Sequence, residues 1–324
     1  MLTFWKEATP EARRALVAAS MGWALDAFDI MLFALVLPEL REDFGMSTAT
    51  AGVLASLTLI ASAFGGVIFG VIADRYGRTR ALILSVLMYS VFTAACGLAT
   101  TVWHLAVFRV LLGLGMGGEW ASGAALVAET WPDKHRGKAM GLMQSAWAIG
   151  FALAALTNWL LVDDYGWRVV FFVGILPAFF TLWVRRAVKE PEAWHQARRE
   201  PHVPLSMIMR GPLGRVTLAL TLMNACTLFA YWGFNSWVPS YLAAPAEQGG
   251  VGLGVDGRTL LLVAMQVGMW FGYVTFGFVA DRIGRKRTYV AYLLIAAVLV
   301  FAYTMIRVPM ILLVLGPVTA FFAT

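Results

Sequence analysis

The sequence predicts an all-α membrane protein built from two homologous halves. Of its 324 residues, 60% are hydrophobic and 14% are charged, whereas a soluble domain carries about 25% charged residues. The apolar residues gather in long runs, and about 20 such residues make a helix that crosses the hydrocarbon core of a bilayer. A short polar motif occurs twice, each time between two apolar runs. Two matching hairpins indicate an internal repeat.

The apolar runs predict about ten transmembrane helices. Those of full length are expected over residues 15–38, 49–73, 81–101, 103–129, 139–162, 167–187, 213–242, 259–280 and 288–307. A further run covers residues 309–324. At about 1.5 Å per residue it is about 24 Å long, which is shorter than the hydrocarbon core of about 30 Å.

These helices group into two halves. Residues 1–187 form an N-terminal six-helix half, residues 188–212 a basic, proline-containing cytoplasmic linker, and residues 213–324 an incomplete C-terminal half with helices seven to ten. Because the repeat calls for six helices in each half, we expect two more helices in a longer parent protein. The 324-residue chain alone is expected to enter a membrane, but neither to transport nor to resist proteolysis across residues 213–324.

The distribution of charge predicts the orientation and excludes several classes of protein. Most of the 25 Lys and Arg residues lie in segments that would be cytoplasmic, which places the amino terminus inside. The first apolar run follows basic residues and is too long for a cleaved signal peptide, so we expect a retained anchor in a bacterial plasma membrane. The net charge is +6, but the basic residues are separated by apolar spans. They therefore do not form the continuous basic patch that binds nucleic acid.

No chemistry of an enzyme is visible in the sequence. Cys96 and Cys226 both lie in apolar spans, so neither a disulfide framework nor a metal site is expected. We find no nucleophile or nucleotide-binding constellation, and we expect no cofactor. The glycine-rich segment 113–118 lies within an apolar run with no strand before it, and it is better explained by close packing of helices than by a phosphate loop.

The repeated motif reads G-x-x-x-D-R-x-G-R-x-R and predicts a tight hairpin that acts as a gate. Its positions are Gly70, Asp74, Arg75, Gly77, Arg78 and Arg80 in the first copy, and Gly277, Asp281, Arg282, Gly284, Arg285 and Arg287 in the second. Glycine allows helices to approach closely, and the aspartate can pair with arginine at a helix end. Glu129 and Arg136 are expected to join this charge network; alternatively, they only anchor helix ends at the membrane surface.

This pattern resembles the signature of the major facilitator superfamily, whose members carry it between helices two and three and, less completely, between helices eight and nine. The resemblance implies a twelve-helix transporter. Segments 25–38, 113–132, 166–168, 171–177 and 190–194 are similar to the sialate and carboxylate proton symporters, and the paired aspartates are similar to those of the aromatic-acid proton symporters. The resemblance to these branches implies an anionic carboxylate that is carried inward with protons.

Charged residues inside the spans are the strongest site candidates. A charge at the bilayer centre costs about 2.5 to 3.5 kcal/mol, so such residues usually serve a function. Asp26 and Asp29 share a face of the first helix. Counting residues from the helix ends brings Asp29 to a depth similar to that of Arg109, and Asp26 to that of Glu119. We expect the first pair to organise the substrate and the second to carry the proton. The alternative is that these charges only lock helices together.

Polar residues on later helices complete the candidate site. Gln144, Asn235 and Gln266 are expected to line the substrate path, since transporters bind their substrate near the midplane between halves. The expected function is proton-coupled transport of a small organic anion by a monomer. One alternative is a transporter of neutral sugars, which would not need Arg109. A second is a non-transporting sensor on the same fold, which would be expected to carry an added signalling domain.

Overall fold

The structure, a computed structural model, describes residues 2–197, 207 and 210–323, and within them all regular structure is helical. Eight helical stretches of these residues are long and apolar enough to cross a membrane. One of them, Asp133–Ala187, has 55 residues and would extend about 80 Å at 1.5 Å per residue. It is interrupted at Gly166, whose φ of 77° and ψ of 169° are not helical, so it crosses the membrane twice, as predicted.

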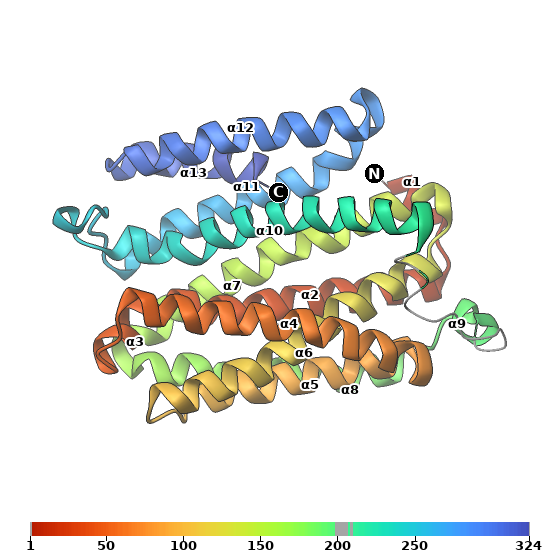
Figure 1. Ribbon diagram of the computed structural model, residues 1–324, viewed down its shortest axis with the longest axis horizontal. Coiled ribbons are helices and arrows are strands. Elements are labelled where there is room, and N and C mark those ends of the chain that lie inside the picture. Colours follow the sequence, from red (N-terminus) through yellow and green to blue (C-terminus); the bar gives the residue numbers. More distant parts are fainter. Residues whose placement is uncertain (1, 198–206, 208–209, 324) are drawn as a thin grey trace.

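The elements follow one another as antiparallel helices (Figure 1). The earlier part of the chain forms α1 (Leu2–Glu7), α2 (Pro10–Leu35), α3 (Leu37–Asp43), α4 (Thr48–Tyr76), α5 (Arg78–Cys96), α6 (Val102–Thr130), α7 (Asp133–Val173), α8 (Leu176–Ala187) and α9 (Glu192–Ala197). The later part forms α10 (Gly211–Ala243), the 3₁₀ turn η2 (Ala246–Gln248), α11 (Val255–Ile283), α12 (Arg285–Met305) and α13 (Pro309–Phe322).

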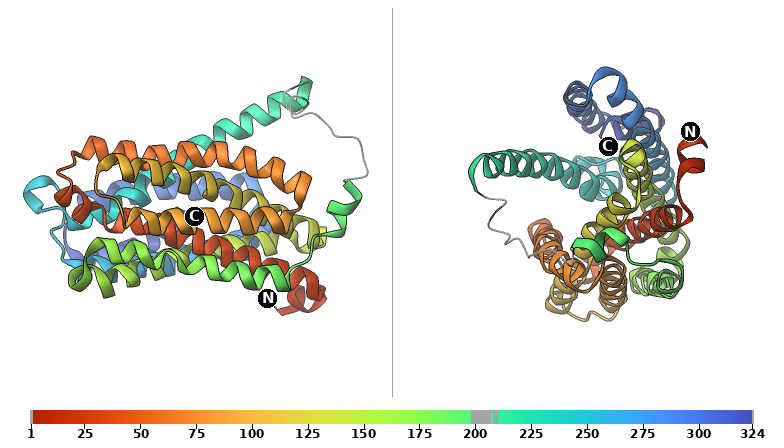
Figure 2. Two further views of the ribbon diagram at one scale, coloured as in Figure 1. Left: turned by 90° about the horizontal axis from the view of Figure 1, so that it is seen from below. Right: turned by 90° about the vertical axis from the view of Figure 1, so that its right-hand side faces the viewer.

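Both copies of the repeated motif lie at the same end of the bundle, which we call the motif end. The opposite end carries α3 and η2 (Figure 1). Helices α2 and α4 to α8 pack against one another, and α11 packs on α7 and α13. In the right-hand view of Figure 2, α10 leans away from the other helices. The predicted linker 188–212 lies partly outside the described residues.

Local sequence signals account for the helix ends. Thr9, Ser47 and Thr101 begin α2, α4 and α6 by accepting a hydrogen bond from a backbone N–H three residues on, at 3.1 to 3.2 Å. Inside the membrane span, a Cβ atom at Gly113 or Gly117 would lie within 2.3 Å of a backbone oxygen of α4. The glycine-rich segment of α6 therefore allows two helices to pack closely, as expected.

Candidate functional site

A cavity lies between the earlier helices α2, α4 and α6 and the later helix α10. Its free volume in this conformation is about 20 Å³. Most of its wall is apolar, and the exceptions are one guanidinium, one hydroxyl and two indole nitrogens. The lining residues are Ile30, Met31, Phe33, Ala34, Leu37, Ala55, Leu59, Arg109, Trp232, Ser236 and Trp237. Because both parts of the chain contribute, the cavity has the location expected for a transported substrate.

Arg109 is the charged residue of this cavity. Its side chain is 2% exposed, and its Cζ atom lies 3.8 Å from the centroid of the Phe33 ring. Nε and Nη1 are buried and have no hydrogen-bond partner among the described residues. A buried cation without a partner costs several kcal/mol, and a carboxylate can accept two parallel hydrogen bonds from one guanidinium. The cavity therefore suits an anion.

Asp29 faces α5 rather than Arg109. Its Oδ2 accepts a hydrogen bond from Thr93 Oγ1 at 3.1 Å. Within the described part of the chain, no ion pair joins Asp29 to Arg109, although both charges act on the thiol of Cys96. Asp29 and Arg109 therefore both lie near Cys96. Their similar depth in the membrane would allow an ion pair between them, but the described structure has none.

Asp26 and Glu119, in contrast, are brought together. A Cβ atom at Gly22, one turn before Asp26 on α2, would lie 2.5 Å from Glu119 Oε1, and the side chains of Asp26 and Glu119 are almost fully buried. Asp26 Oδ2 and both oxygens of Glu119 have no hydrogen-bond partner among the described residues. The hydroxyl of Tyr89 donates to the carbonyl oxygen of Gly22 at 3.5 Å. Two adjacent carboxylates away from water are unfavourable when both are ionised, so the geometry favours a bound proton or cation between them.

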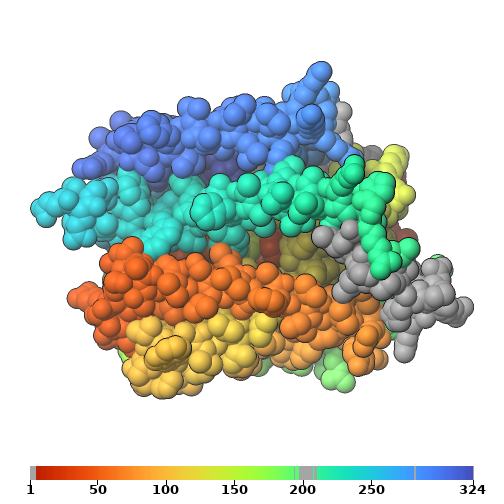
Figure 3. Space-filling model, in the orientation of Figure 1, coloured from red at the N-terminus to blue at the C-terminus, as the bar shows by residue number. Residues whose placement is uncertain are grey.

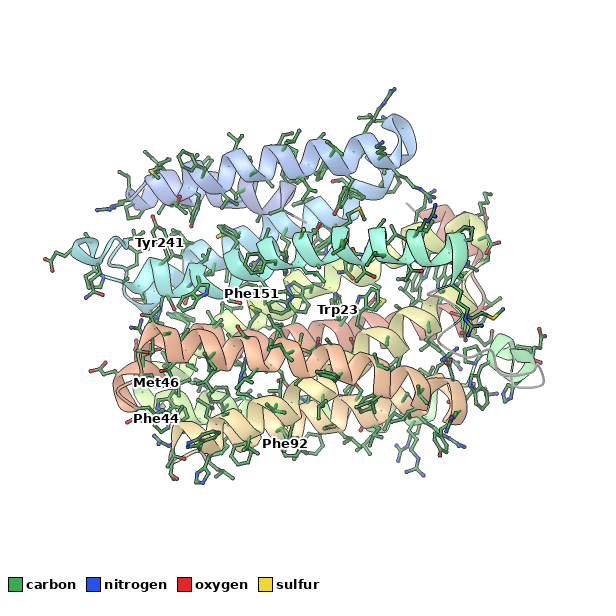
Figure 4. All side chains as sticks on the ribbon, viewed as in Figure 1. Trp23, Phe44, Met46, Phe92, Phe151 and Tyr241 are labelled. Atoms are coloured by element: carbon green, nitrogen blue, oxygen red, sulfur yellow. The ribbon has the colours of Figure 1, made fainter. Side chains whose placement is uncertain are left out.

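An aromatic cluster of Trp23, Trp147, Tyr231 and Trp232 borders the cavity on the side of the motif end. The ring of Trp147 lies 4.8 Å from that of Trp23, 5.5 Å from Trp232 and 6.4 Å from Tyr231, measured between centroids. Trp232 also lines the cavity. Figure 4 shows Trp23 in the space between α10 and α4. Three helices, α2, α7 and α10, therefore meet at this cluster.

The predicted polar lining residues are spread over three places. Gln144 interacts with the hydroxyl of Tyr273, which also interacts with Tyr231 of the aromatic cluster. Asn235 donates from Nδ2 to the carbonyl oxygen of Tyr231 at 3.0 Å and lines a separate pocket between α10 and α12. Gln266 lines an apolar groove between α7 and α11. Asn235 and Gln266 thus do not line the Arg109 cavity.

At the motif end, Arg78 of the first motif copy joins a charge network. Nε and Nη2 donate to Glu129 Oε1 at 3.1 and 2.9 Å, and Nη1 pairs with Asp74 one turn earlier. Arg136, which was expected in this network, instead forms an ion pair with Asp133 at 2.6 Å. Arg136 lies three residues after Asp133 on α7, so the nearer carboxylate takes the pair.

The segment after α8 docks on the same motif copy. Glu190 accepts hydrogen bonds from the backbone N–H groups of Thr79 at 3.1 Å and Arg80 at 3.3 Å, so it caps the first turn of α5. Trp194 Nε1 donates to the carbonyl oxygens of Ala73 at 3.1 Å and Asp74 at 2.9 Å. The hairpin is therefore held from both sides of its turn.

The remaining motif residues are open to their surroundings. Arg75, Arg80, Arg282, Arg285 and Arg287 are exposed, and the side chain of Asp281 lies outside the described part of the structure. A Cβ atom at Gly70 or Gly277 would meet no atom within 4 Å. Among the described residues, the close helix approach expected at these two glycines is therefore not present.

Helix α1 adds a contact at the motif end. His135 Nε2 donates to Glu7 Oε2 at 2.7 Å, and Lys134 lies 3.7 Å from the same oxygen. The hydrogen bond from His135, with the charge of Lys134, lowers the pKa of the Glu7 carboxyl. Ring centroids of Trp5 and Trp131 lie 6.4 Å apart. These contacts attach the amino terminus to the junction between α6 and α7.

At the opposite end, two polar contacts of the described residues join the earlier helices to α11, and sequence reasoning missed both. Arg258 Nη2 forms an ion pair with Glu39 Oε1 at 2.5 Å, and Trp159 Nε1 donates to Asp256 Oδ1 at 2.6 Å. We call these four residues the opposite-end latch. Arg258 is 4% exposed although it stands near a span end, where a basic residue is usually taken for a surface anchor. Its partner on α3 gives no sequence signal.

Comparison with known proteins assigns the chain to a family. The profile of the Major Facilitator Superfamily matches residues 19–324. The chain belongs to this superfamily. A putative metabolite transport protein of Haemophilus influenzae is 33% identical over 321 residues, which are 95% of this chain and 77% of that protein. A probable 4-methylmuconolactone transporter of Cupriavidus pinatubonensis is 36% identical over 313 residues, which are 94% of this chain and 72% of that protein.

A third relative and a solved structure agree with this assignment. The sialic acid transporter NanX of Escherichia coli is 34% identical over 291 residues, which are 90% of this chain and 70% of that protein. The crystal structure of a bacterial homologue of the human lysosomal transporter Spinster, in an inward-facing and unoccupied conformation, has a TM-score of 0.71 at 20% identity and covers 98% of this chain and 73% of that one. The resemblance predicted from the motifs is confirmed, and the protein is a multi-pass transporter.

Proposed function

We propose that this transporter carries a small organic carboxylate inward together with protons. The observation that carries the proposal is the buried guanidinium of Arg109, which lines the cavity between the two parts of the chain without a hydrogen-bond partner among the described residues. Relatives named as transporters of cis,cis-muconate and of benzoate, both from Acinetobacter baylyi, support an acidic substrate. We treat the protein as a carrier without catalytic activity or cofactor.

We assign the two charged sites different roles. Arg109 binds the carboxylate of the substrate, because its fork of N–H donors matches two carboxylate oxygens. Asp26 and Glu119 carry the coupling proton, because their charges interact and three of their four oxygens are buried without a partner among the described residues. Asp29 accepts a hydrogen bond from Thr93 and so holds α2 against α5. Its charge also contributes to the electrostatic potential at the proton site.

We propose that the halves, residues 1–187 and 213–324, rock about the cavity as a monomer, joined by the linker 188–212. The motif end and the amino terminus then face the cytoplasm of a bacterial cell. The opposite-end latch ties α3 and α7 to α11. Figure 3 shows a hollow between α4 and α10 on the side of the bundle. The latch supports a state that is closed at the opposite end, in line with alternating access around a central site.

The substrate role of Arg109 is tested by Arg109→Lys in the reconstituted full-length parent protein, because the 324-residue chain alone is not expected to transport. Lysine keeps the charge but loses the planar fork of donors, so uptake of labelled benzoate or muconate should fall at least about tenfold, which corresponds to about 1.4 kcal/mol. Lys189→Arg, at an exposed position after α8, is the control and should retain uptake. Normal uptake by Arg109→Lys would remove Arg109 from the site.

The proton role is tested by separating accumulation from exchange. Asp26→Asn or Glu119→Gln should abolish accumulation driven by a proton gradient but leave exchange of labelled for unlabelled acid intact, because exchange needs no net movement of protons. Asp29→Asn should weaken both processes to a similar degree. If all three variants kept the pH dependence of the unmodified protein, none of the carboxylates would carry the coupling proton.

A further inference from the structure

Thr93 on α5 has one hydroxyl proton and two acceptors within reach. Its Oγ1 lies 3.1 Å from Asp29 Oδ2 on α2, and 2.9 Å from the carbonyl oxygen of Tyr89, one turn earlier on its own helix. Thr93 and Asp29 are both buried. A hydroxyl has one donor and two acceptor lone pairs, so Thr93 can donate to only one of these oxygens at a time. Its O–H bond therefore has two useful directions.

Each direction of the hydroxyl matches one protonation state of Asp29. When Asp29 is ionised, Thr93 donates to Oδ2, and the carbonyl oxygen of Tyr89 keeps the backbone hydrogen bond of the helix. When Asp29 is neutral, its own O–H donates to Thr93 Oγ1, and Thr93 donates to the carbonyl oxygen of Tyr89. Thr93 can thus serve both states without a change in the position of its heavy atoms.

The second oxygen of Asp29 makes the neutral state accessible. Oδ1 is buried and has no hydrogen-bond partner among the described residues. An ionised Asp29 would then have one hydrogen bond for a buried charge, which is unfavourable. A neutral acid needs only one acceptor for its proton, and Thr93 supplies it. The surroundings of Asp29 therefore suit a group that gains and loses a proton.

Packing against Gly174 fixes the rotation of the Thr93 side chain. Gly174 follows the last residue of α7, and a Cβ atom there would lie 2.2 Å from Thr93 Cγ2. The methyl group of Thr93 thus occupies the space that the glycine leaves. Gly174 has φ −62° and ψ −5°, which any residue can adopt, so its small size is what the contact requires. Because the methyl and the hydroxyl share one carbon, this contact directs the hydroxyl at α2.

Few other ionisable groups lie around Asp29 in the described structure. Helix α7 has none between residues 138 and 163, and α8 has its two arginines in its last turn, away from Gly174. The groups that remain are Asp26 on the same helix, Tyr89 and Cys96 on α5, and Arg109 on α6, which lies near Cys96. Thr93 is the residue among the described ones that makes a side-chain hydrogen bond to Asp29.

We propose that Thr93 is a positioning residue for protonation of Asp29, because its hydroxyl turns between Asp29 and the backbone as Asp29 loses or gains a proton. Thr93 keeps its own proton throughout, and the proton on Asp29 is exchanged with water. The inference rests on the proposed function, in which Asp29 acts on the site of Asp26 and Glu119. A charge on Asp29 favours a proton at that site, and neutral Asp29 removes this effect.

Variants in the full-length parent protein separate the hydroxyl of Thr93 from its shape. Thr93→Val keeps the shape but removes the hydroxyl, and Thr93→Ser keeps the hydroxyl but removes the methyl. Thr58→Val is the matched control. Thr58 on α4 is equally buried, and among the described residues its hydroxyl bonds only to the carbonyl oxygen four residues earlier, at 3.2 Å. Both valines remove this helical contact, but only Thr93→Val removes the partner of a carboxyl group.

Infrared spectroscopy of the purified parent follows the protonated carboxyl group of Asp29 directly. Absorption that titrates with pH in the unmodified protein and is lost in Asp29→Asn belongs to this group. A hydrogen bond to a charged group is stronger than one to a neutral group, so Thr93→Val should raise the midpoint of this titration by about one pH unit. Thr93→Ser and Thr58→Val should leave the midpoint unchanged. A carboxyl group that never titrates, or a midpoint that Thr93→Val does not move, would overturn the inference.

Uptake of labelled benzoate by proteoliposomes, measured over a range of external pH, gives a second readout. The pH profile should move up by about one unit in Thr93→Val, and Thr93→Val should cause no further shift when Asp29→Asn is also present. Thr93→Ala replaces the valine variant if that one does not fold. An equal shift in Thr93→Ser would assign the effect to packing and overturn the inference. Uptake by the unmodified protein that ignores a proton gradient would instead overturn the proposed coupling, while the infrared titration would still decide the role of Thr93.

Discussion

The two copies of the repeated motif have the same backbone but different surroundings. Gly77 has φ 119° and ψ 148°, and Gly284 has φ 99° and ψ 136°. In each copy the glycine N–H donates to the carbonyl oxygen of the alanine four residues earlier, at 3.1 and 3.0 Å. The first copy is bound by Glu129, Glu190 and Trp194. In the second copy the arginine side chains are exposed.

This difference shows that the turn is a property of the motif itself, whereas the attachment of the turn depends on residues outside the motif. Eleven residues are enough to end one helix and begin the next, because a glycine with positive φ allows a turn that other residues resist. Attachment of the turn depends on residues far away in the chain, such as Glu190, which reaches back to Thr79. Residues from outside the motif thus hold the first copy, whereas the arginine side chains of the second copy are exposed. Three pairs of variants can break or sharpen this contrast.

The largest effect is expected for Gly77→Ala compared with Gly284→Ala. Both glycines occupy a region of φ and ψ that costs other residues about 1 to 3 kcal/mol. At Gly77 the new Cβ would also lie 2.3 Å from Glu190 Oε1, whereas at Gly284 no atom of the described residues would lie within 4 Å. Gly77→Ala should therefore lose about 1 to 2 kcal/mol more stability than Gly284→Ala. Melting temperatures in detergent check this, and equal losses would show that Glu190 moves away freely.

The next effect is expected for Arg78→Ala compared with Arg285→Ala, which alters the same motif position. Loss of Arg78 leaves the half-buried Glu129 without the two hydrogen bonds it now accepts, which should cost about 1 to 3 kcal/mol. Arg285 is exposed, and changes at such positions usually stay within about 0.5 kcal/mol. Chemical unfolding in detergent measures both. A larger loss for Arg285→Ala would place the stabilising network on the second copy.

The smallest effect is expected for Glu190→Ala compared with Glu192→Ala. Glu190 caps two backbone N–H groups of α5, and the loss of such a cap costs about 1 kcal/mol. Glu192 is exposed two residues later and serves as the control. The expected result is a small loss of stability together with faster proteolysis between α8 and α10 in Glu190→Ala alone. Identical proteolysis of the two variants would mean that the cap does not hold the segment.

Much of the fold and part of the candidate site follow from the sequence alone. Hydropathy and helix periodicity are properties of contiguous residues, so the spans, the paired turns at Gly77 and Gly284, and the glycine contact of α6 with α4 were all predictable. The buried charges Asp26, Arg109 and Glu119 were found for the same reason, since a charge within an apolar run is visible in one dimension.

Only the tertiary structure decided which of these residues face one another. Counting residues along helices gives depth but not rotation about the axis. Glu119 faces α2 one turn from Asp26, whereas Asp29 turns to Thr93. For the same reason, the sequence did not predict that Asn235 and Gln266 lie in other pockets than the Arg109 cavity. The opposite-end latch pairs Glu39 with Arg258 across more than 200 residues. Such contacts depend on the packing of whole helices, which no local pattern encodes.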